Sequence, residues 1–179
     1  MKNFSKVLIG AAALALCVGP TAANAGSQTT TLSISASVTS NCTALTPSSI
    51  SFGSYDVFTY PTGTPLKDNT AATFSTNCTL NAPINWTVGI GNSCGQGSVP
   101  ADRAMTDGAS HYLSYELYQN SAFTTPWAFA SSCGAPTAVS QTGAGSTTAN
   151  TISVYGLIPG GQNAYENSYS DSVTVTVSF

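Results

Sequence analysis

The sequence has little charge and almost no basic character. Only 6% of its 179 residues are charged, with four Lys and Arg against seven Asp and Glu. No basic patch is present, which argues against binding to nucleic acid or to anionic membranes. There is one histidine, His111, with no second histidine or CxxC pair near it. We therefore expect no metal site and no cofactor.

Long apolar runs are also scarce. The one clear run, from Val7 to Val18, is shorter than the ~20 residues that a membrane-spanning helix needs. Lys2 and Lys6 precede it and Ala23-Asn24-Ala25 follows it, which is the pattern of a cleaved signal peptide covering residues 1–25. A lipoprotein box ending at Cys17 is disfavoured because Leu16 is not small. We expect export, and no membrane insertion of the mature chain.

Removing residues 1–25 from the 179 leaves a mature chain of 154 residues with two basic and seven acidic side chains, a net charge of −5. This length fits one domain with a core of its own. The mature chain keeps Cys42, Cys78, Cys94 and Cys133. Four cysteines in an exported protein predict two disulfides, for which three connectivities are possible.

Helical periodicity is nearly absent after residue 25, and short segments with alternating apolar and polar residues take its place. The alternating segments are 31–38, 50–52, 72–76, 84–90, 113–118, 152–154 and 173–179. Turn-forming clusters of Gly, Pro, Asn and Ser separate them. About seven short strands of this kind predict an all-β fold, a two-sheet sandwich in a single domain.

Both ends of the mature chain have a strand-like pattern. Near the N-terminus the apolar face consists of Leu32, Ile34, Ala36 and Val38, and near the C-terminus it consists of Val173, Val175, Val177 and Phe179. A long exposed edge strand is a template for pairing with another chain. The pattern alone favours the simpler interpretation, in which the N-terminal strand pairs within its own sandwich.

Catalytic patterns are weak. Residues 91–95 read Gly-Asn-Ser-Cys-Gly and match a nucleophile elbow, but no helical pattern follows Ser93 and Cys94 is expected in a disulfide. The acidic residues lie mostly in turn-like segments, where solvated or capping roles are usual. We therefore expect no catalytic residues and no enzyme.

As a whole, the chain resembles the spore coat protein U family, which includes pilins of the archaic chaperone–usher pathway such as Csu pilus subunits. The blocks that carry the resemblance follow in order along the mature chain: Ser40-Asn41-Cys42, residues 50–55 (Ile-Ser-Phe-Gly-Ser-Tyr), the segment around Cys78, Arg103-Ala104-Met105, residues 113–118, residues 154–159 and residues 169–179. The pair Cys94 and Cys133 is not expected in every member.

The resemblance implies an immunoglobulin-like sandwich that lacks its last strand, formed by residues 40–179. Residues 26–39 would be a donor-strand segment, with Leu32, Ile34, Ala36 and Val38 entering the groove of a neighbouring subunit. Val173, Val175, Val177 and Phe179 would border that groove. The implied partners are neighbouring pilin subunits, a periplasmic chaperone and an outer-membrane usher, and the implied destination is a fimbrium on the cell surface that supports adhesion and biofilm formation.

Two other functions are considered. A tip adhesin would need a second domain, whereas a non-fibrous secreted coat protein is a serious alternative that the sequence does not exclude. Similar Asn-Cys-Thr settings suggest that Cys42 pairs with Cys78, which leaves Cys94 to pair with Cys133.

Overall fold

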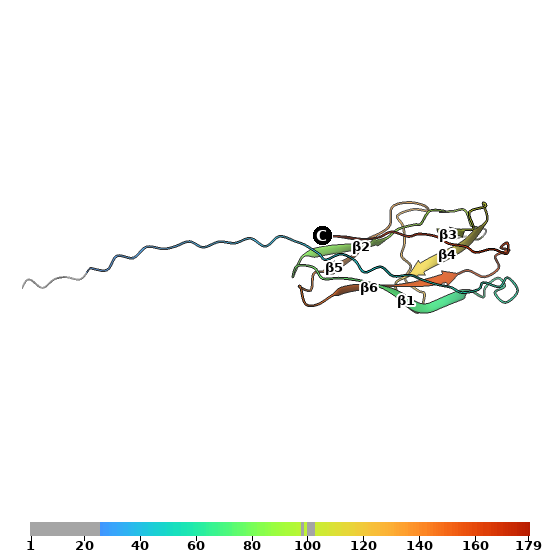
Figure 1. The fold of residues 1–179 in the computed structure, drawn as a ribbon, viewed down its shortest axis with the longest axis horizontal. Helices are drawn as coiled ribbons and strands as arrows, with labels where there is room; N and C mark the ends of the chain where they lie inside the picture. Colours follow the sequence, from blue (N-terminus) through green and yellow to red (C-terminus); the bar gives the residue numbers. More distant parts are fainter. Residues whose placement is uncertain (1–25, 98, 100–102) are drawn as a thin grey trace, which may run out of the picture. The chain divides into compact units, whose positions relative to one another are not determined.

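A computed structural model describes residues 26–97, 99 and 103–179 (Figure 1). The signal peptide expected at residues 1–25, with Cys17, lies outside the described residues. Residues Val38–Phe179 form one compact unit, and residues 1–37 are grouped as another. Between residues 26 and 37 the chain forms no strand, and every side chain is exposed. The strand expected at residues 31–38 is therefore absent, because a strand needs a partner for its backbone hydrogen bonds.

The described residues form seven strands and no helix, as expected for an all-β fold. The strands are β1 (Leu66–Thr76), β2 (Pro83–Val88), β3 (Arg103–Thr106), β4 (Tyr112–Tyr118), β5 (Val139–Thr142), β6 (Asn150–Ile158) and β7 (Val175–Ser178). They make two antiparallel sheets, one with the order β1-β6-β4-β3 and the other with the order β5-β2-β7. This is the two-sheet sandwich that the alternation predicts, and it is consistent with the immunoglobulin-like fold that the resemblance implies.

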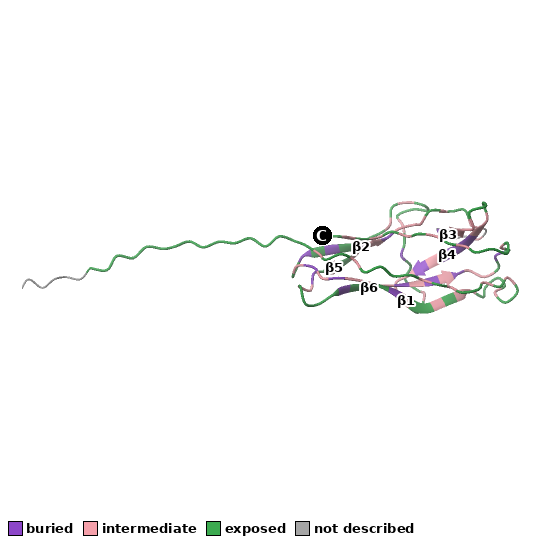
Figure 2. Cartoon of the chain, viewed as in Figure 1, coloured by how far each residue is buried: buried purple, intermediate pink, exposed green. Residues whose placement is uncertain are grey.

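The core lies between the inner faces of the two sheets. In β2 the apolar face that the alternation predicts is fully enclosed, with Ile84, Trp86 and Val88 all buried. Figure 2 shows buried residues along β2, β4 and β6. Trp86 also donates from Nε1 to Gln141 Oε1 at 3.2 Å, so its one polar atom is satisfied. Removing a buried aromatic of this size costs ~3–5 kcal/mol of stability.

Two strands were not expected from the sequence, β3 and β5. β3 carries Arg103, which is fully buried and donates to the backbone oxygens of Gly89, Val88 and Trp127. A charged residue at the start of a four-residue strand hides the alternating pattern. β5 is short and polar, and it forms because β2 supplies a pairing partner. Conversely, the strand expected at residues 50–52 is absent, although Ile50 and Phe52 do face the core.

Both predicted pairs of cysteines are bonded in the structure. Cys42 and Cys78 are joined with a Cα–Cα distance of 4.1 Å, and Cys94 and Cys133 with 5.6 Å. The first disulfide attaches the start of the domain to the segment that follows β1. It is accompanied by backbone hydrogen bonds from Thr43 N to Asn77 O (3.0 Å) and from Thr79 N to Asn41 O (2.9 Å).

Candidate functional site: a groove between the two ends of the domain

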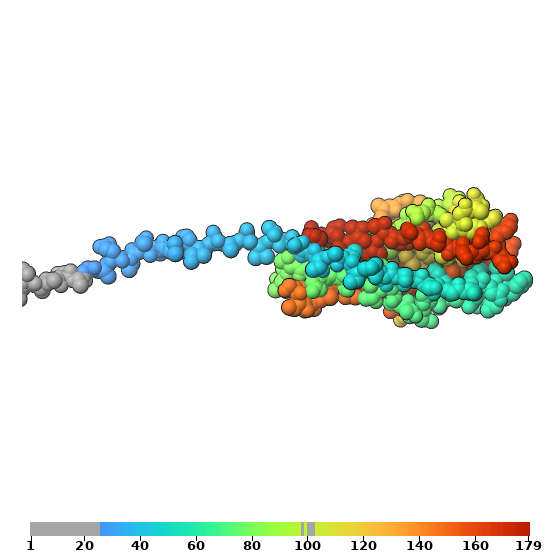
Figure 3. Space-filling model, viewed as in Figure 1, coloured from blue at the N-terminus to red at the C-terminus, as the bar shows by residue number. Residues whose placement is uncertain are grey.

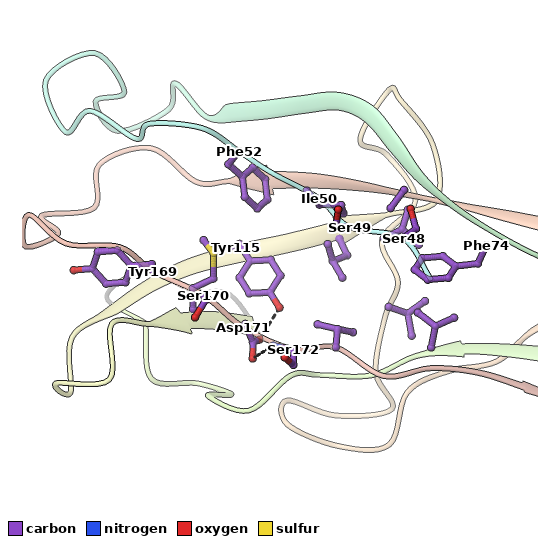
Figure 4. Close-up of a pocket in the computed structure, with 17 residues that line it drawn as sticks. Ser48, Ser49, Ile50, Phe52, Phe74, Tyr115, Tyr169, Ser170, Asp171 and Ser172 are labelled. Atoms are coloured by element: carbon purple, nitrogen blue, oxygen red, sulfur yellow. Dashed lines mark hydrogen bonds between the residues drawn. The ribbon is translucent and has the colours of Figure 1, made fainter. Parts of the chain in front are cut away.

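A hollow that opens to the core of the sandwich, called the groove below, lies between an early and a late segment of the domain. One wall is residues 48–52 and the other is residues 169–175, and core side chains of both sheets form the floor. Its volume is about 420 Å³. Figure 3 shows the two walls running along one face of the molecule, and Figure 4 shows Tyr115 between Phe52 of the early wall and Asp171 of the late wall.

The early wall is extended but has no strand partner. Ile50 and Phe52 are half-buried while Ser49, Ser51 and Gly53 are exposed, which is the alternation of a strand. Within the described part of the chain, residues 44–55 make no backbone–backbone hydrogen bond to any other segment. The wall therefore has strand geometry with its backbone groups left open on both sides.

The early wall lies close to the four-stranded sheet because Gly156 has no side chain. A Cβ at Gly156 would lie 2.5 Å from Phe52 Cζ and 3.0 Å from Ile50 Cγ2. Phe52 also meets the Tyr115 ring edge-on, with the ring centroids 6.3 Å apart. The side chains of the wall are thus held by contacts with β6 and β4 rather than by a backbone ladder.

The late wall is attached to the rest of the domain along one edge only. Ser170 and Thr106 exchange two backbone hydrogen bonds of 3.0 Å, and Gly89 N donates to Thr174 O at 2.8 Å. Residues 175–178 then pair with β2 as β7. β7 is the edge strand of its sheet, so its other edge has no partner among the described residues. That free edge faces the groove.

Asp171 fixes the position of the late wall. Its carboxylate accepts hydrogen bonds from the Tyr115 hydroxyl at 2.7 Å, from Asn92 N at 2.9 Å and from Ser172 N at 2.7 Å. Gly91, with φ of +84°, allows this approach, since a Cβ there would collide with the Asp171 carboxylate. Burial, then the hydrogen bond to Asp171 and its negative charge, raise the pKa of Tyr115 far above the usual value, so the phenol remains a donor.

The lining of the groove indicates what it can hold. Its floor is mainly apolar, with Ala72, Val88, Leu117 and Val154 from both sheets. The only charged side chain in the lining is Asp171, whose oxygens are occupied by the hydrogen bonds above. The groove therefore offers apolar contacts and open backbone edges, which suits an extended peptide with alternate apolar side chains.

The residues predicted as the groove border occupy the late wall and β7. Val173, Val175 and Val177 are half-buried against the core, and Val173 and Val175 line the groove. Phe179 is exposed and does not line it. The predicted donor residues are all exposed. The large apolar side chains of Leu32, Ile34 and Val38 are 83–86% exposed and therefore uncovered, and Ala36 is exposed too.

The sequence did not reveal the early wall or the polar contact on the groove floor. Ile50 and Phe52 were predicted as a strand, but not as a wall of the site. The acidic residues were expected mostly in solvated or capping roles, and Asp56 does cap a turn by accepting from Phe58 N at 3.0 Å, whereas Asp171 lines the groove. A tyrosine on the inner face of the segment at residues 113–118 was the one available signal, because a buried hydroxyl needs a partner.

The other candidate residues lie away from the groove. Ser93 sits in a turn beside the disulfide-bonded Cys94, and no helix follows it in the described residues. His111 Nδ1 lies 2.7 Å from Asp107 Oδ2, and its ring stacks on Tyr165. In the described ranges there is no cluster of three potential metal ligands and no helix suited to crossing a membrane.

Residues 28–176 match the family model of the spore coat protein U domain. The chain belongs to this family. The match confirms the resemblance given by the sequence blocks and extends over both walls of the groove. This spore coat protein U domain is also 30% identical to Protein U of Myxococcus xanthus over 133 residues, which cover 73% of this chain and 71% of that protein.

Among solved structures, the chain is similar to a chain in the crystal structure of the CsuC–CsuE chaperone–tip adhesion subunit pre-assembly complex from archaic chaperone–usher Csu pili of Acinetobacter baumannii. The identity is 21% and the TM-score 0.45, and the alignment covers 79% of this chain. It spans about 40% of the length of the other chain. A likeness this low supports no argument about function.

Proposed function

We propose that this protein is a structural subunit of a surface fibre in which each copy completes the sandwich of its neighbour by donor-strand exchange. The observation that supports the proposal is the groove, an opening to the core between two extended segments that each have at least one open backbone edge. The chain also carries a segment that fits such a groove, residues 26–39, whose alternating apolar side chains are exposed.

Strand addition explains how such a joint would hold. Backbone hydrogen bonds to the open edges would supply affinity, and Leu32, Ile34, Ala36 and Val38 would fill the space above the floor. Burying Leu32, Ile34 and Val38 stabilises a joint by ~1.5–3 kcal/mol each. Since the donor segment and the groove are different surfaces, the contact is head-to-tail and generates a filament.

The finer points of the proposal rest on the family resemblance. A signal peptide at residues 1–25 would direct export, a periplasmic chaperone would fill the groove during transit, and an outer-membrane usher would assemble the fibre. Adhesion and biofilm formation would follow from fibres on the cell surface. The alternative is a non-fibrous secreted coat protein, which the name of the family favours but which gives no role to an open groove.

The test places charge on the donor face. In Leu32→Asp/Ile34→Asp the carboxylates would have to enter an apolar groove, where burying an unpaired charge costs several kcal/mol. We expect soluble subunit–chaperone complex in the periplasm and no surface fibres by electron microscopy. The matched control is Ser33→Asp/Ser35→Asp, which adds the same charge to the opposite face and should still give fibres.

Two results contradict the proposal. Normal fibres from Leu32→Asp/Ile34→Asp mean that residues 26–39 are not the donor. Failure of the same variant to fold in the presence of chaperone means that this segment belongs to its own sandwich, as an ordinary complete domain would require.

A further inference from the structure

The exposed large apolar side chains are not spread over the sandwich. In the described residues they are Leu32, Ile34, Val38, Phe58, Leu80, Tyr165 and Phe179. The first three belong to the proposed donor region. The other four lie at the two ends of the sandwich, and the outer faces of the sheets carry none of them. Single exposed apolar residues are common, but their restriction to the two ends calls for an explanation.

The two ends, called poles below, are separated by the length of β1. The Phe58 pole lies where β1 begins and β6 ends, with the turns at residues 56–63 and 159–167. The Leu80 pole lies where β1 ends and β6 begins, as the pairing of Leu66 with Ile158 and of Thr76 with Asn150 shows. Eleven residues of extended chain span roughly 35 Å.

Phe58 stands exposed on a hydrogen-bonded turn. The side chain is 91% exposed, although its own backbone N donates to Asp56 Oδ1 at 3.0 Å and Tyr60 N donates to Asp56 O at 3.0 Å. Phe58 and Tyr165 both line a second hollow, which shares Ile50, Phe52, Met105 and Tyr169 with the groove and continues it to this pole. The groove is therefore reached from the Phe58 pole.

Leu80 lies at the opposite pole, beside the point where the donor region joins the domain. It is 66% exposed in a turn closed by Ala82 N donating to Thr79 O at 3.0 Å. Asn41 N donates to the Thr79 hydroxyl at 3.0 Å, and the neighbouring Cys42 is bonded to Cys78. The chain therefore enters its own domain next to Leu80, and the disulfide fixes this position.

A continuous fibre is possible only if the donor enters through the Phe58 pole. If it entered at the other end of the groove, two Leu80 poles would face each other, and the acceptor would block the entry to the groove of the donor subunit. Entry at the Phe58 pole places the Leu80 pole of one copy against the Phe58 pole of the next, and the same contact repeats.

The connecting segment is too short to separate the two domains. If Val38 is the last residue inside the groove of the acceptor, only Thr39, Ser40 and Asn41 connect it to Cys42, where the domain of the donor subunit begins. Four residue steps of extended chain reach at most ~14 Å. Exposed apolar side chains stand on both facing surfaces, and this distance brings them within reach of each other.

We infer that Phe58 of one subunit packs against Leu80 of the next, in a second contact between copies of this chain that lies outside the groove. The inference rests on the proposed donor-strand function. Beyond joining the subunits, the contact makes the joint stiff, because a three-residue connection alone would let neighbouring domains pivot.

Cysteine cross-linking in assembled fibres tests this contact. Phe58→Cys/Leu80→Cys is expressed as the full chain with its chaperone and usher, and the fibres are oxidised and then dissociated in hot denaturant without reductant. A disulfide forms only where the Cα atoms come within ~7 Å, so we expect a ladder of covalent multimers on a gel. Thr73→Cys/Leu80→Cys is the control, since Thr73 is exposed midway along β1, and it should give no ladder.

The outcomes separate the contact from the function. Fibres of Phe58→Cys/Leu80→Cys that dissociate to monomers overturn the contact and leave donor-strand exchange standing. An absence of fibres from the unaltered chain overturns the proposed function and the contact with it.

A second measurement needs no cysteine and uses Phe58→Ser, Leu80→Ser and the double variant. The guanidinium midpoint of fibre dissociation should fall in each single variant and should fall no further in the double variant. Additive shifts contradict direct packing.

Discussion

The Tyr115 hydroxyl donates to the Asp171 carboxylate at 2.7 Å and joins β4 to the late wall of the groove. The two residues are 56 positions apart in the sequence, and both line the groove. Asp171 also accepts from the backbone at Asn92, so one carboxylate connects three segments. The late wall is therefore held in place by contacts within the domain itself, which would lower the ordering cost of the proposed strand addition.

Tyr115→Phe should destabilise the domain. It removes a hydrogen bond to a charged acceptor, which is worth ~1.5–3 kcal/mol, while keeping the ring and its packing. Denaturant unfolding of the purified chain measures the loss, with Tyr112→Phe as the control because Tyr112 makes no side-chain hydrogen bond in the described structure. Equal losses from the two variants would show that the contact with Asp171 contributes nothing.

Stability should also decline in alkali through the same residue. Burial, then the contact with Asp171, raises the pKa of Tyr115 in the folded state above its unfolded value of ~10. The unfolded state then loses the proton first, so the contribution is complete below about pH 10 and falls by up to ~1.4 kcal/mol per pH unit above it. Unfolding free energies measured from pH 8 to 11.5 should fall more steeply for the unaltered chain than for Tyr115→Phe. Parallel curves would refute this.

Gly156→Ala should displace the early wall. The new methyl group would meet the Phe52 ring at 2.5 Å, and overpacking of this kind costs ~1–3 kcal/mol. Phe52→Leu removes the ring atom that is met, so the double variant should recover most of the loss in thermal unfolding. If Phe52→Leu and Gly156→Ala were simply additive, the close approach of the wall to β6 would not be the cause.

The two disulfides should differ in their contribution. They close loops of similar length, with sequence separations of 36 and 39, and chain entropy assigns ~3–4 kcal/mol to each. Cys78 is buried whereas Cys133 is exposed, so Cys42→Ser/Cys78→Ser should cost more than Cys94→Ser/Cys133→Ser. Denaturant midpoints of the two variants make the comparison.

Non-reducing peptide mapping checks the pairing of the cysteines, and a peptide linking Cys42 to Cys94 or Cys133 would disprove it.

Several strands could be predicted because their pattern is local. Ile84, Trp86 and Val88 alternate with polar residues, and the same holds along β4, β6 and β7. Successive side chains of a strand point to opposite faces, so the sequence of a half-buried strand alternates between apolar and polar residues. β3 and β5 were not predicted because neither shows this alternation: β3 begins with the buried Arg103, and β5 is a mostly polar stretch of four residues.

The groove was harder to predict than the strands. The alternation of residues 50–52 indicated a strand, yet a strand also requires a paired backbone, and no described segment pairs with this one. Likewise, the alternation of Leu32, Ile34, Ala36 and Val38 is a property of the sequence, while the surface that covers them is not. Their role as donor residues stays a prediction until the charged variants are tested.

The sequence by itself determined the fold class, the number of cysteines available for bonding and the apolar face of most strands, since these depend on composition and on neighbours two residues apart. Only the tertiary structure decided that residues 48–52 and 169–175 face each other across the core, that Asp171 meets Tyr115, and that Phe58 and Leu80 mark opposite poles. Each of these depends on which segments pair across long stretches of chain, and pairing is set by the sum of many contacts in the folded domain rather than by any local pattern.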